Sequence, residues 1–276
     1  MSKAKILYVS QEITPFLPKS EVSEMCLNLP KKIKDMDKEV RVFMPRYGKI
    51  NERRHQLHEV IRLSGINLII NDTDHPLIIK VASIPAARMQ VYFIDNEEYF
   101  KRKAYMTDDK ENFFPDSDER AMFFARGVLE TVKKLQWKPD IIHCHGWMAS
   151  LMPLYLKELY HDDPHFEDVK VVYSAYENGF TGNLDSDLSK KLVMDGLPEN
   201  KLEGLAETNY DSLTRIAVEN SDAVIIGSET LSKDSSDFIK KSGIDVLEYQ
   251  DPENFVEAYN DFYNGLLEKK TELIEQ

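Results

Sequence analysis

The sequence has little cysteine and no long apolar run. Only two of its 276 residues are cysteines, Cys26 and Cys144. So few thiols exclude a disulfide framework and predict a reducing, cytoplasmic location. No segment approaches the roughly 20 consecutive apolar residues that cross a bilayer, so we expect no membrane partner. The first apolar stretch, residues 6–9, is too short for a signal peptide and is typical of a β-strand.

Positive charge and metal-ligating patterns are also scarce. The chain has 35 Lys and Arg against 48 Asp and Glu, a formal net charge of −13. Nucleic acids and anionic membranes require a basic face, so we expect neither as a partner. With two cysteines and scattered histidines no zinc-type spacing can be assembled, and the chain has no glycine-rich dinucleotide or triphosphate loop. We therefore expect no metal and no bound cofactor.

The sequence does contain short apolar runs rich in β-branched residues that alternate with longer segments of helical period. Several of these runs are apolar on both faces, as strands buried between two helix layers are. The helical segments are residues 21–34, with Ser20 as cap, 118–135 and about 147–160. Pro30 should kink or shorten the first of these helices. The predicted strands are residues 5–10, 39–44, 91–94, 140–144, 169–174, 223–227 and 245–248.

This alternation predicts an α/β fold, a Rossmann-like doubly wound parallel sheet with right-handed crossovers. Residues 57–90 differ, because apolar runs at 60–63, 68–70 and 77–82 are separated by turn residues. We interpret them as a small antiparallel insertion at the sheet edge. Residues 179–205 are expected to form a long surface loop or short helices. A closing helix is expected at about 252–270, which gives a single domain over residues 1–276.

Ligands of open α/β sheets bind beyond the carboxyl ends of the strands, and three such ends carry polar residues here. The first runs from Glu12 to Lys19 and Ser20 at a helix start, where a lysine and free amide groups suit a phosphate. The second contains His143 and His145, of which one could contact a sugar hydroxyl or transfer a proton. The third is the segment 173–179. Each has a structural alternative that remains open: Ser20 is only a helix cap, the histidines are one buried and one surface residue, and the third segment is an ordinary loop.

Taken together, these segments resemble the N-terminal domain of the glycogen and starch synthase family of glycosyltransferases. The similarity runs in order over most of residues 4–240. It rests on the segments 6–15 (ILYVSQEITP), 29–31 (LPK), 40–48 (VRVFMPRYG), 91–96 (VYFIDN), 137–147 (WKPDIIHCHGW) and 221–224 (SDAV) followed by Ser228.

The resemblance implies one half of a GT-B fold and transfer of glucose from ADP-glucose or UDP-glucose to an α-1,4-glucan, without a metal. Lys19 and Ser20 align with the family's donor phosphate loop, and His145 aligns with the catalytic histidine that contacts the transferred glucose. The resemblance implies weaker sugar or acceptor contacts at Glu12, Tyr92, Ser174, Tyr176 and Asn178.

The sequence departs from the family at three places. Ser20-Glu21-Val22 stands where the family has Thr-Gly-Gly, Gly146 replaces an aspartate, and Ser174-Ala175 replaces His-Asn. The chain also has about half the family's length, so we expect turnover to need a second domain, for example on a second chain that completes the cleft. The alternative is a non-catalytic glucan-binding or regulatory module descended from the synthase domain.

Overall fold

The computed structural model describes residues 3–108, 112–177, 179–251 and 253–274. Within these ranges the strands form a ten-stranded sheet of order β10-β9-β8-β7-β1-β2-β6-β5-β3, and β4 pairs with β5. The strands from β10 to β6 run parallel to their neighbours, and β5 joins β6 antiparallel. The parallel strands are β1 Lys5–Ser10, β2 Glu39–Pro45, β6 Met89–Asp95, β7 Ile141–His145, β8 Lys170–Ala175, β9 Ala223–Ile226 and β10 Asp245–Leu247.

The chain reverses its direction across the sheet at β1. From β1 it proceeds through β2 to β6, and it then crosses back to β7 on the other side of β1. This order produces a switch point between the carboxyl ends of β1 and β7, where Ser10 and His145 are in register. Doubly wound sheets bind ligands at such points. The predicted fold class, a Rossmann-like doubly wound sheet, is therefore confirmed.

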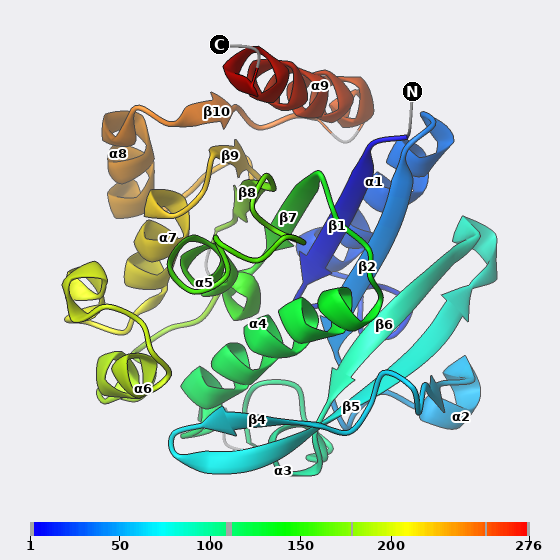
Figure 1. The fold of residues 1–276 in the computed structure, drawn as a ribbon, viewed down its shortest axis with the longest axis vertical. Coiled ribbons are helices and arrows are strands. Elements are labelled where there is room, and N and C mark those ends of the chain that lie inside the picture. Colours follow the sequence, from blue (N-terminus) through cyan, green and yellow to red (C-terminus); the bar gives the residue numbers. More distant parts are fainter. Residues whose placement is uncertain (1–2, 109–111, 178, 252, 275–276) are drawn as a thin grey trace.

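Helices cover both faces of the sheet (Figure 1). Those of at least ten residues are α1 Glu21–Asp35, α4 Ser117–Lys134, α7 Tyr210–Glu219, α8 Lys233–Ser242 and α9 Phe255–Ile274. The shorter helices are α2 Glu52–His55, α3 Glu97–Phe100, α5 Met152–Glu158 and α6 Leu188–Met194, with 3-10 turns at Pro85–Ala87, Trp147–Ala149, Glu199–Lys201 and Glu203–Leu205.

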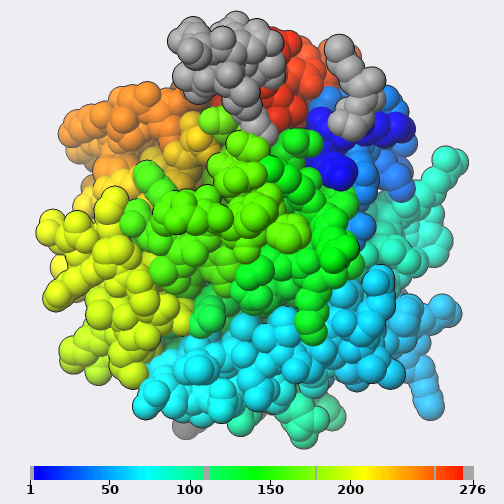
Figure 2. Space-filling view, viewed as in Figure 1, coloured from blue at the N-terminus to red at the C-terminus, as the bar shows by residue number. Residues whose placement is uncertain are grey.

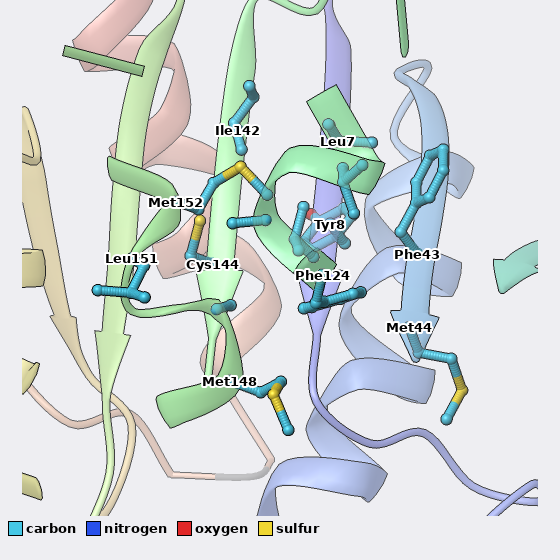
Figure 3. Close-up of a cluster of buried hydrophobic side chains, with 14 of the residues drawn as sticks. Leu7, Tyr8, Phe43, Met44, Phe124, Ile142, Cys144, Met148, Leu151 and Met152 are labelled. Atoms are coloured by element: carbon cyan, nitrogen blue, oxygen red, sulfur yellow. The ribbon is translucent and has the colours of Figure 1, made fainter. Parts of the chain in front are cut away.

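The alternation of side chains along β1 and β7 divides the core into two layers. Leu7 and Cys144 point to the face that α4 and α5 cover (Figure 3). Tyr8 and His143 point to the opposite face, where Tyr263 of α9 contacts both. The first face is lined by apolar side chains (Figure 3) and contributes mainly hydrophobic stabilisation. Each large apolar side chain that is buried contributes about 1.5–3 kcal/mol. The second face is rich in hydroxyl and imidazole groups.

The antiparallel insertion consists of β3 His58–Glu59, β4 Ile66–Ile70 and β5 Thr73–Ile84, at the lower edge of the molecule in Figure 2. The prediction of a strand at residues 60–63 was wrong. These residues form a turn in which the amide of Leu63 donates to the carbonyl of Val60. Ile61 is 83% exposed, because this turn leaves the sheet instead of extending along it.

Two helix predictions need correction. Pro30 does not shorten α1, which continues to Asp35 with Leu29 and Ile33 fully buried. Their packing offsets the hydrogen bond that a proline removes, a cost of about 3 kcal/mol. The predicted helix at 147–160 is a 3-10 turn followed by α5, because Pro153 fixes a new first turn there. None of the helices in the described ranges combines the length and the apolarity that a bilayer-spanning helix requires.

Candidate functional site

The start of α1 brings Glu12, Lys19 and Ser20 together at the carboxyl end of β1. The Ser20 hydroxyl donates to Oε1 of Glu12 at 2.6 Å and accepts the amide of Ser23 at 3.0 Å. Ser20 is therefore the N-cap of α1, as its sequence position predicts. The second carboxylate oxygen of Glu12 accepts the hydroxyl of Tyr105 at 2.9 Å, and Glu12 is only 8% exposed.

The ammonium group of Lys19 is exposed and lies 2.8 Å from the carboxylate of Glu24, one turn into α1. This hydrogen bond raises the pKa of Lys19, so the side chain is charged at neutral pH. Glu21 faces another way, and its carboxylate accepts the Ser228 hydroxyl at 2.7 Å. The first turn of α1 thus carries two carboxylates beside the predicted phosphate position.

A cavity of about 410 Å³ opens beside this helix start. Its walls come from α1, from Gly227 after β9 and from the chain that leads into α9, including Tyr249 and Phe255. Glu24, the partner of Lys19, also lines it. The volume falls in the range of small-molecule sites, about 300–1,000 Å³.

His145 ends β7 and is fully buried on the face covered by α1 and α9. Its Nδ1 lies 2.8 Å from the hydroxyl of Tyr176, whereas its Nε2 has no hydrogen-bond partner among the described residues. Burial lowers the pKa of His145 to about 3, so the imidazole is neutral at physiological pH. A neutral imidazole with one free nitrogen can accept or donate a hydrogen bond to a hydroxyl, depending on its tautomer.

The imidazole of His143 packs against that of His145 and is itself held by two hydroxyl groups. The His143 ring lies 3.9 Å from the His145 ring, measured between centroids. His143 contacts the Ser174 hydroxyl through Nε2 and the Tyr263 hydroxyl through Nδ1, each at 2.7 Å. Burial, and secondarily the charge of His145, lowers the pKa of His143 well below its usual value. Ser174 is therefore fixed within the core beneath His143.

Tyr176 separates His145 from the cavity. Its ring occupies the space beside Gly227, where an added Cβ would lie 2.6 Å from Cε1 of the ring. Its carbonyl accepts the hydroxyl of Tyr210 at 2.9 Å, and the residue is 4% exposed. The ring of Tyr176 therefore lies between His145 and the Gly227 wall of the cavity.

Gly146 follows β7 with φ of 81°, a conformation that favours glycine. A Cβ at this position would lie 2.3 Å from Oε1 of Gln11. The end of the Gln11 side chain can shift, so the positive φ is the feature that favours glycine at this position.

The remaining predicted residues do not join this cluster. Tyr92 is the middle residue of β6, and its side chain lies with Arg41 toward the amino ends of the strands, where Arg41 donates to its hydroxyl at 3.3 Å. Asn178 lies outside the described residues. In the described ranges we find no group of three or more His, Cys, Asp or Glu side chains placed to hold a metal ion.

Tyr105 and Arg120, which were not predicted as site residues, lie behind Glu12. Arg120 is 1% exposed and donates to the carbonyl of Tyr105 at 3.0 Å, and its guanidinium lies 5.5 Å from the centre of the Tyr47 ring. The signal for Arg120 was a cation on the apolar face of α4, four residues before Phe124. Tyr105 belongs to a segment without periodicity, so the sequence carried no comparable signal for it.

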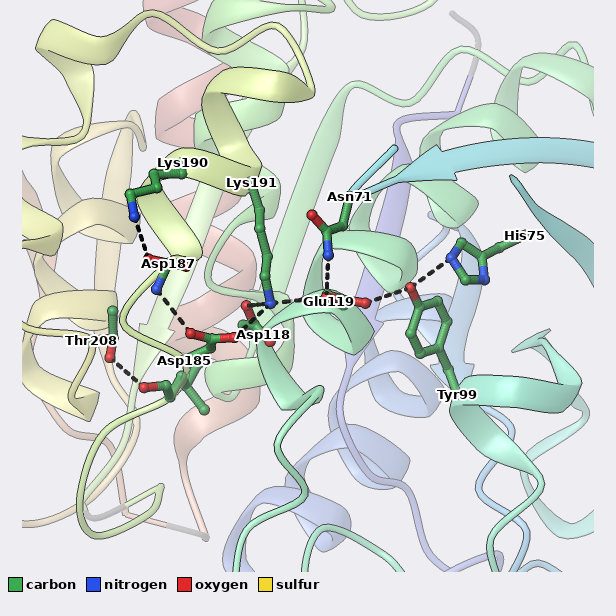
Figure 4. A network of polar contacts seen from close by, with 11 residues as sticks. Asn71, His75, Tyr99, Asp118, Glu119, Asp185, Asp187, Lys190, Lys191 and Thr208 are labelled. Carbon is green, nitrogen blue, oxygen red and sulfur yellow. Dashed lines mark hydrogen bonds and ion pairs between the residues drawn. The ribbon is translucent and has the colours of Figure 1, made fainter. Parts of the chain in front are cut away.

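A second polar network joins α4 to α6 (Figure 4). The Lys191 ammonium lies 2.8 Å from carboxylates of Asp118 and Glu119 and 2.9 Å from Asp185. Tyr99 extends the network by donating to Glu119 at 3.0 Å. Because every carboxylate here faces the same cation, we assign this network a structural role.

A doubly wound sheet with a capped helix start and a neutral buried histidine at its switch point defines a Rossmann-like domain. The sequence model of the starch synthase catalytic domain matches residues 5–247. The chain belongs to this family.

Among its relatives, the glycogen synthase of Chlorobium phaeobacteroides is 38% identical over 241 residues, which cover 87% of this chain and 48% of that protein. The glycogen synthase of Chlorobium limicola is 40% identical over 190 residues, covering 68% and 39%. The catalytic domain of starch synthase IV from Arabidopsis thaliana, bound to ADP and acarbose, superimposes with a TM-score of 0.66 at 18% identity, covering 81% of this chain and 45% of that one. The chain thus spans about half the length of these proteins, and its fold corresponds to one half of a GT-B glycosyltransferase.

Proposed function

We propose that this chain forms the N-terminal half of a glucosyltransferase. The reaction moves glucose from ADP-glucose or UDP-glucose to the end of an α-1,4-glucan in the cytoplasm. Membership of the starch synthase family supports this reaction class. The main support for the proposed site is that Nε2 of His145, buried at the β1–β7 switch point, has no hydrogen-bond partner among the described residues.

Lys19 and Ser20 form the donor phosphate side of the proposed site. The exposed Lys19 ammonium leaves Glu24 at little cost, because surface ion pairs contribute little to stability. It then faces the diphosphate, and the amide groups at the start of α1 add their partial positive charge. Glu21 and Glu24 weaken this attraction, so we expect a lower nucleotide affinity than a glycine loop would give.

His145 forms the sugar side. Once the ring of Tyr176 turns aside, Nε2 of the neutral imidazole meets a hydroxyl of the transferred glucose and orients that sugar. His143 keeps the imidazole in place, and Ser174 acts only through His143. Glu12, Tyr176 and Asn178 contribute to sugar or acceptor binding. Tyr92 is left out, since its side chain lies toward the amino ends of the strands. A second domain, on this protein or on another chain, supplies the rest of the nucleotide pocket.

Calorimetric titration of the chain with ADP-glucose, ADP and maltoheptaose tests the proposal. We expect nucleotide binding that is lost in Lys19→Ala and kept in Lys190→Ala, whose exposed ammonium pairs with Asp187. His145→Gln retains a hydrogen-bonding side chain and should weaken the sugar nucleotide more than ADP. Glucan binding without any nucleotide binding would contradict this proposal and favour the alternative, a non-catalytic glucan-binding module. Binding of neither ligand would overturn both.

A further inference from the structure

A cavity of about 520 Å³ lies at the amino edge of the sheet, away from the site described above. Its walls come from the chain before β1, the end of α1, the start of β2 and the first half of β6. Because β1, β2 and β6 run parallel, this edge lies a strand length, about 17 Å, from the carboxyl ends that carry the proposed site. The volume suits a small molecule.

Positive charge is concentrated in this cavity, in a chain whose formal net charge is −13. The carboxylate of Glu39 is held by the indole N–H of Trp137 at 2.6 Å. Lys3 forms an ion pair with Asp37 at the rim. The charged residues of the wall are Lys3, Lys34, Lys38, Arg41 and Arg88 against Glu39.

Two of the lysines are held by neutral acceptors. The Lys34 ammonium donates to the backbone carbonyl of Arg88 at 2.6 Å, and the Lys38 ammonium donates to the side-chain oxygen of Asn260 at 2.6 Å. These contacts fix the position of each ammonium group without neutralising its charge. Burial lowers the pKa of Lys38, so a bound anion would favour its charged form.

Arg41 is fixed in a similar way. Its guanidinium lies 5.0 Å from the centre of the Trp137 ring and 5.8 Å from that of Tyr92, and it donates to the Tyr92 hydroxyl. The partly buried Arg46, in contrast, pairs with the carboxylate of Asp95 at 2.9 Å. Arg41 therefore presents an oriented guanidinium fork whose protein partners in the described ranges are neutral.

We propose that this cavity binds a small phosphate-bearing anion at a site separate from the carboxyl edge. A guanidinium fork matches two oxygens of a phosphate group, and ammonium groups add point charges around it. Arg41 holds the phosphate, and Lys34, Lys38 and Arg88 surround it. Several converging cations favour a multivalent anion over a single carboxylate.

The test is calorimetric titration of the full chain with pyrophosphate and with inorganic phosphate at constant ionic strength. We expect one pyrophosphate to bind, and Arg41→Gln to weaken binding by at least about tenfold, as loss of a charge-assisted hydrogen bond does. Arg88→Gln, at an exposed position, should weaken it as well. Lys190→Gln is the matched control for removal of one surface charge and should leave the affinity unchanged.

Lys19→Ala separates this site from the proposed donor site, and pyrophosphate binding should survive in it. Loss of binding in Lys19→Ala with no effect of Arg41→Gln and Arg88→Gln would overturn the inference while supporting the donor site. Absence of pyrophosphate binding, or equal weakening by Lys190→Gln, would also overturn it. Intrinsic fluorescence and thermal melting of each variant establish that it is folded before titration.

Discussion

The hydroxyl of Tyr263 lies 2.7 Å from Nδ1 of His143 and links α9 to β7 across 120 residues of sequence. The same hydroxyl accepts a hydrogen bond from Tyr8 at 3.3 Å. All three side chains are fully buried, so α9 completes the polar layer on this face of the sheet. The helix thus holds His143, and through it the orientation of His145.

Tyr263→Phe removes one hydroxyl and leaves Nδ1 of His143 buried without a partner. We expect the free energy of unfolding to fall by about 1–3 kcal/mol, the cost of an unsatisfied buried polar group. Urea denaturation of wild type and variant measures this difference in the free energy of unfolding. Tyr249→Phe, on the wall of the 410 Å³ cavity, is the control and should have a smaller effect. Equal effects would mean that the Tyr263 hydroxyl contributes nothing specific.

The two buried histidines make stability depend on pH. Their pKa values are lowered in the folded state, so the unfolded chain takes up protons that the folded chain does not. Stability is therefore complete above about pH 6.5 and falls as the pH drops, by about 1.4 kcal/mol per unit for each histidine. For His145 the loss continues to about pH 3.

Urea denaturation at pH 7, 6 and 5 checks this dependence. The slope of the free energy of unfolding against pH gives the number of protons taken up on unfolding, and His145→Gln should reduce that number by about one. Carboxylates that titrate in the same pH range contribute equally to both proteins, so the difference between them reports on His145 alone. An unaltered slope in His145→Gln would show that folding does not lower the pKa of His145.

Lys191→Met leaves the buried carboxylate of Asp118 without its cation. We expect a loss of about 3–5 kcal/mol, because an unpaired buried charge is strongly destabilising. The neighbouring Lys190→Met removes an exposed pair with Asp187 and should change stability little. Thermal or urea denaturation of both variants compares them directly. Similar values would mean that the Lys191 network is as accessible to water as the surface pair.

Gly227→Ala places a methyl group against the ring of Tyr176. We expect a loss of about 1–3 kcal/mol from overpacking, together with displacement of Tyr176 from His145. Gly265→Ala in α9 is the control, since an added Cβ meets no atom within 4 Å there. That change should stabilise the chain by about 0.5–1 kcal/mol through helix propensity. A neutral Gly227→Ala would show that Tyr176 is readily displaced.

Glu24→Gln removes the carboxylate that pairs with Lys19. If Lys19 binds the donor diphosphate, ADP should bind severalfold more tightly to this variant, with the gain decreasing at high salt. Glu97→Gln removes an exposed partner of Lys101 and should leave ADP affinity unchanged. Calorimetry gives both values. No gain in Glu24→Gln would argue against a role for Lys19 at the phosphates.

The strand prediction succeeded where strands are buried on both faces. The apolar runs at β1, β2, β7 and β8 have β-branched residues throughout, and their predicted bounds lie within one residue of those observed. Local pattern was insufficient for residues 60–63, because an apolar run at a sheet edge can turn away as easily as it can extend.

Predicting the site from sequence was harder than predicting the strands. Glu12, Lys19 and Ser20 are near one another in the chain, and a helix start after β1 was enough to group them. Tyr105 reaches Glu12 across 93 residues, so no local signal connected them. Tyr92 shares β6 with residues at the carboxyl edge, yet it lies three residues before that end of the strand.

The sequence by itself determined the α/β class, the order of strands and helices, the capped start of α1 and the family of the chain. These depend on periodicity, on capping residues and on matched segments, all of which are local. Only the tertiary structure decided that Tyr176 seals His145, that Glu24 holds Lys19, and that five cations meet at the amino edge of the sheet. Each of these depends on side-chain directions and on the packing of elements against one another, and one sequence does not specify those distances.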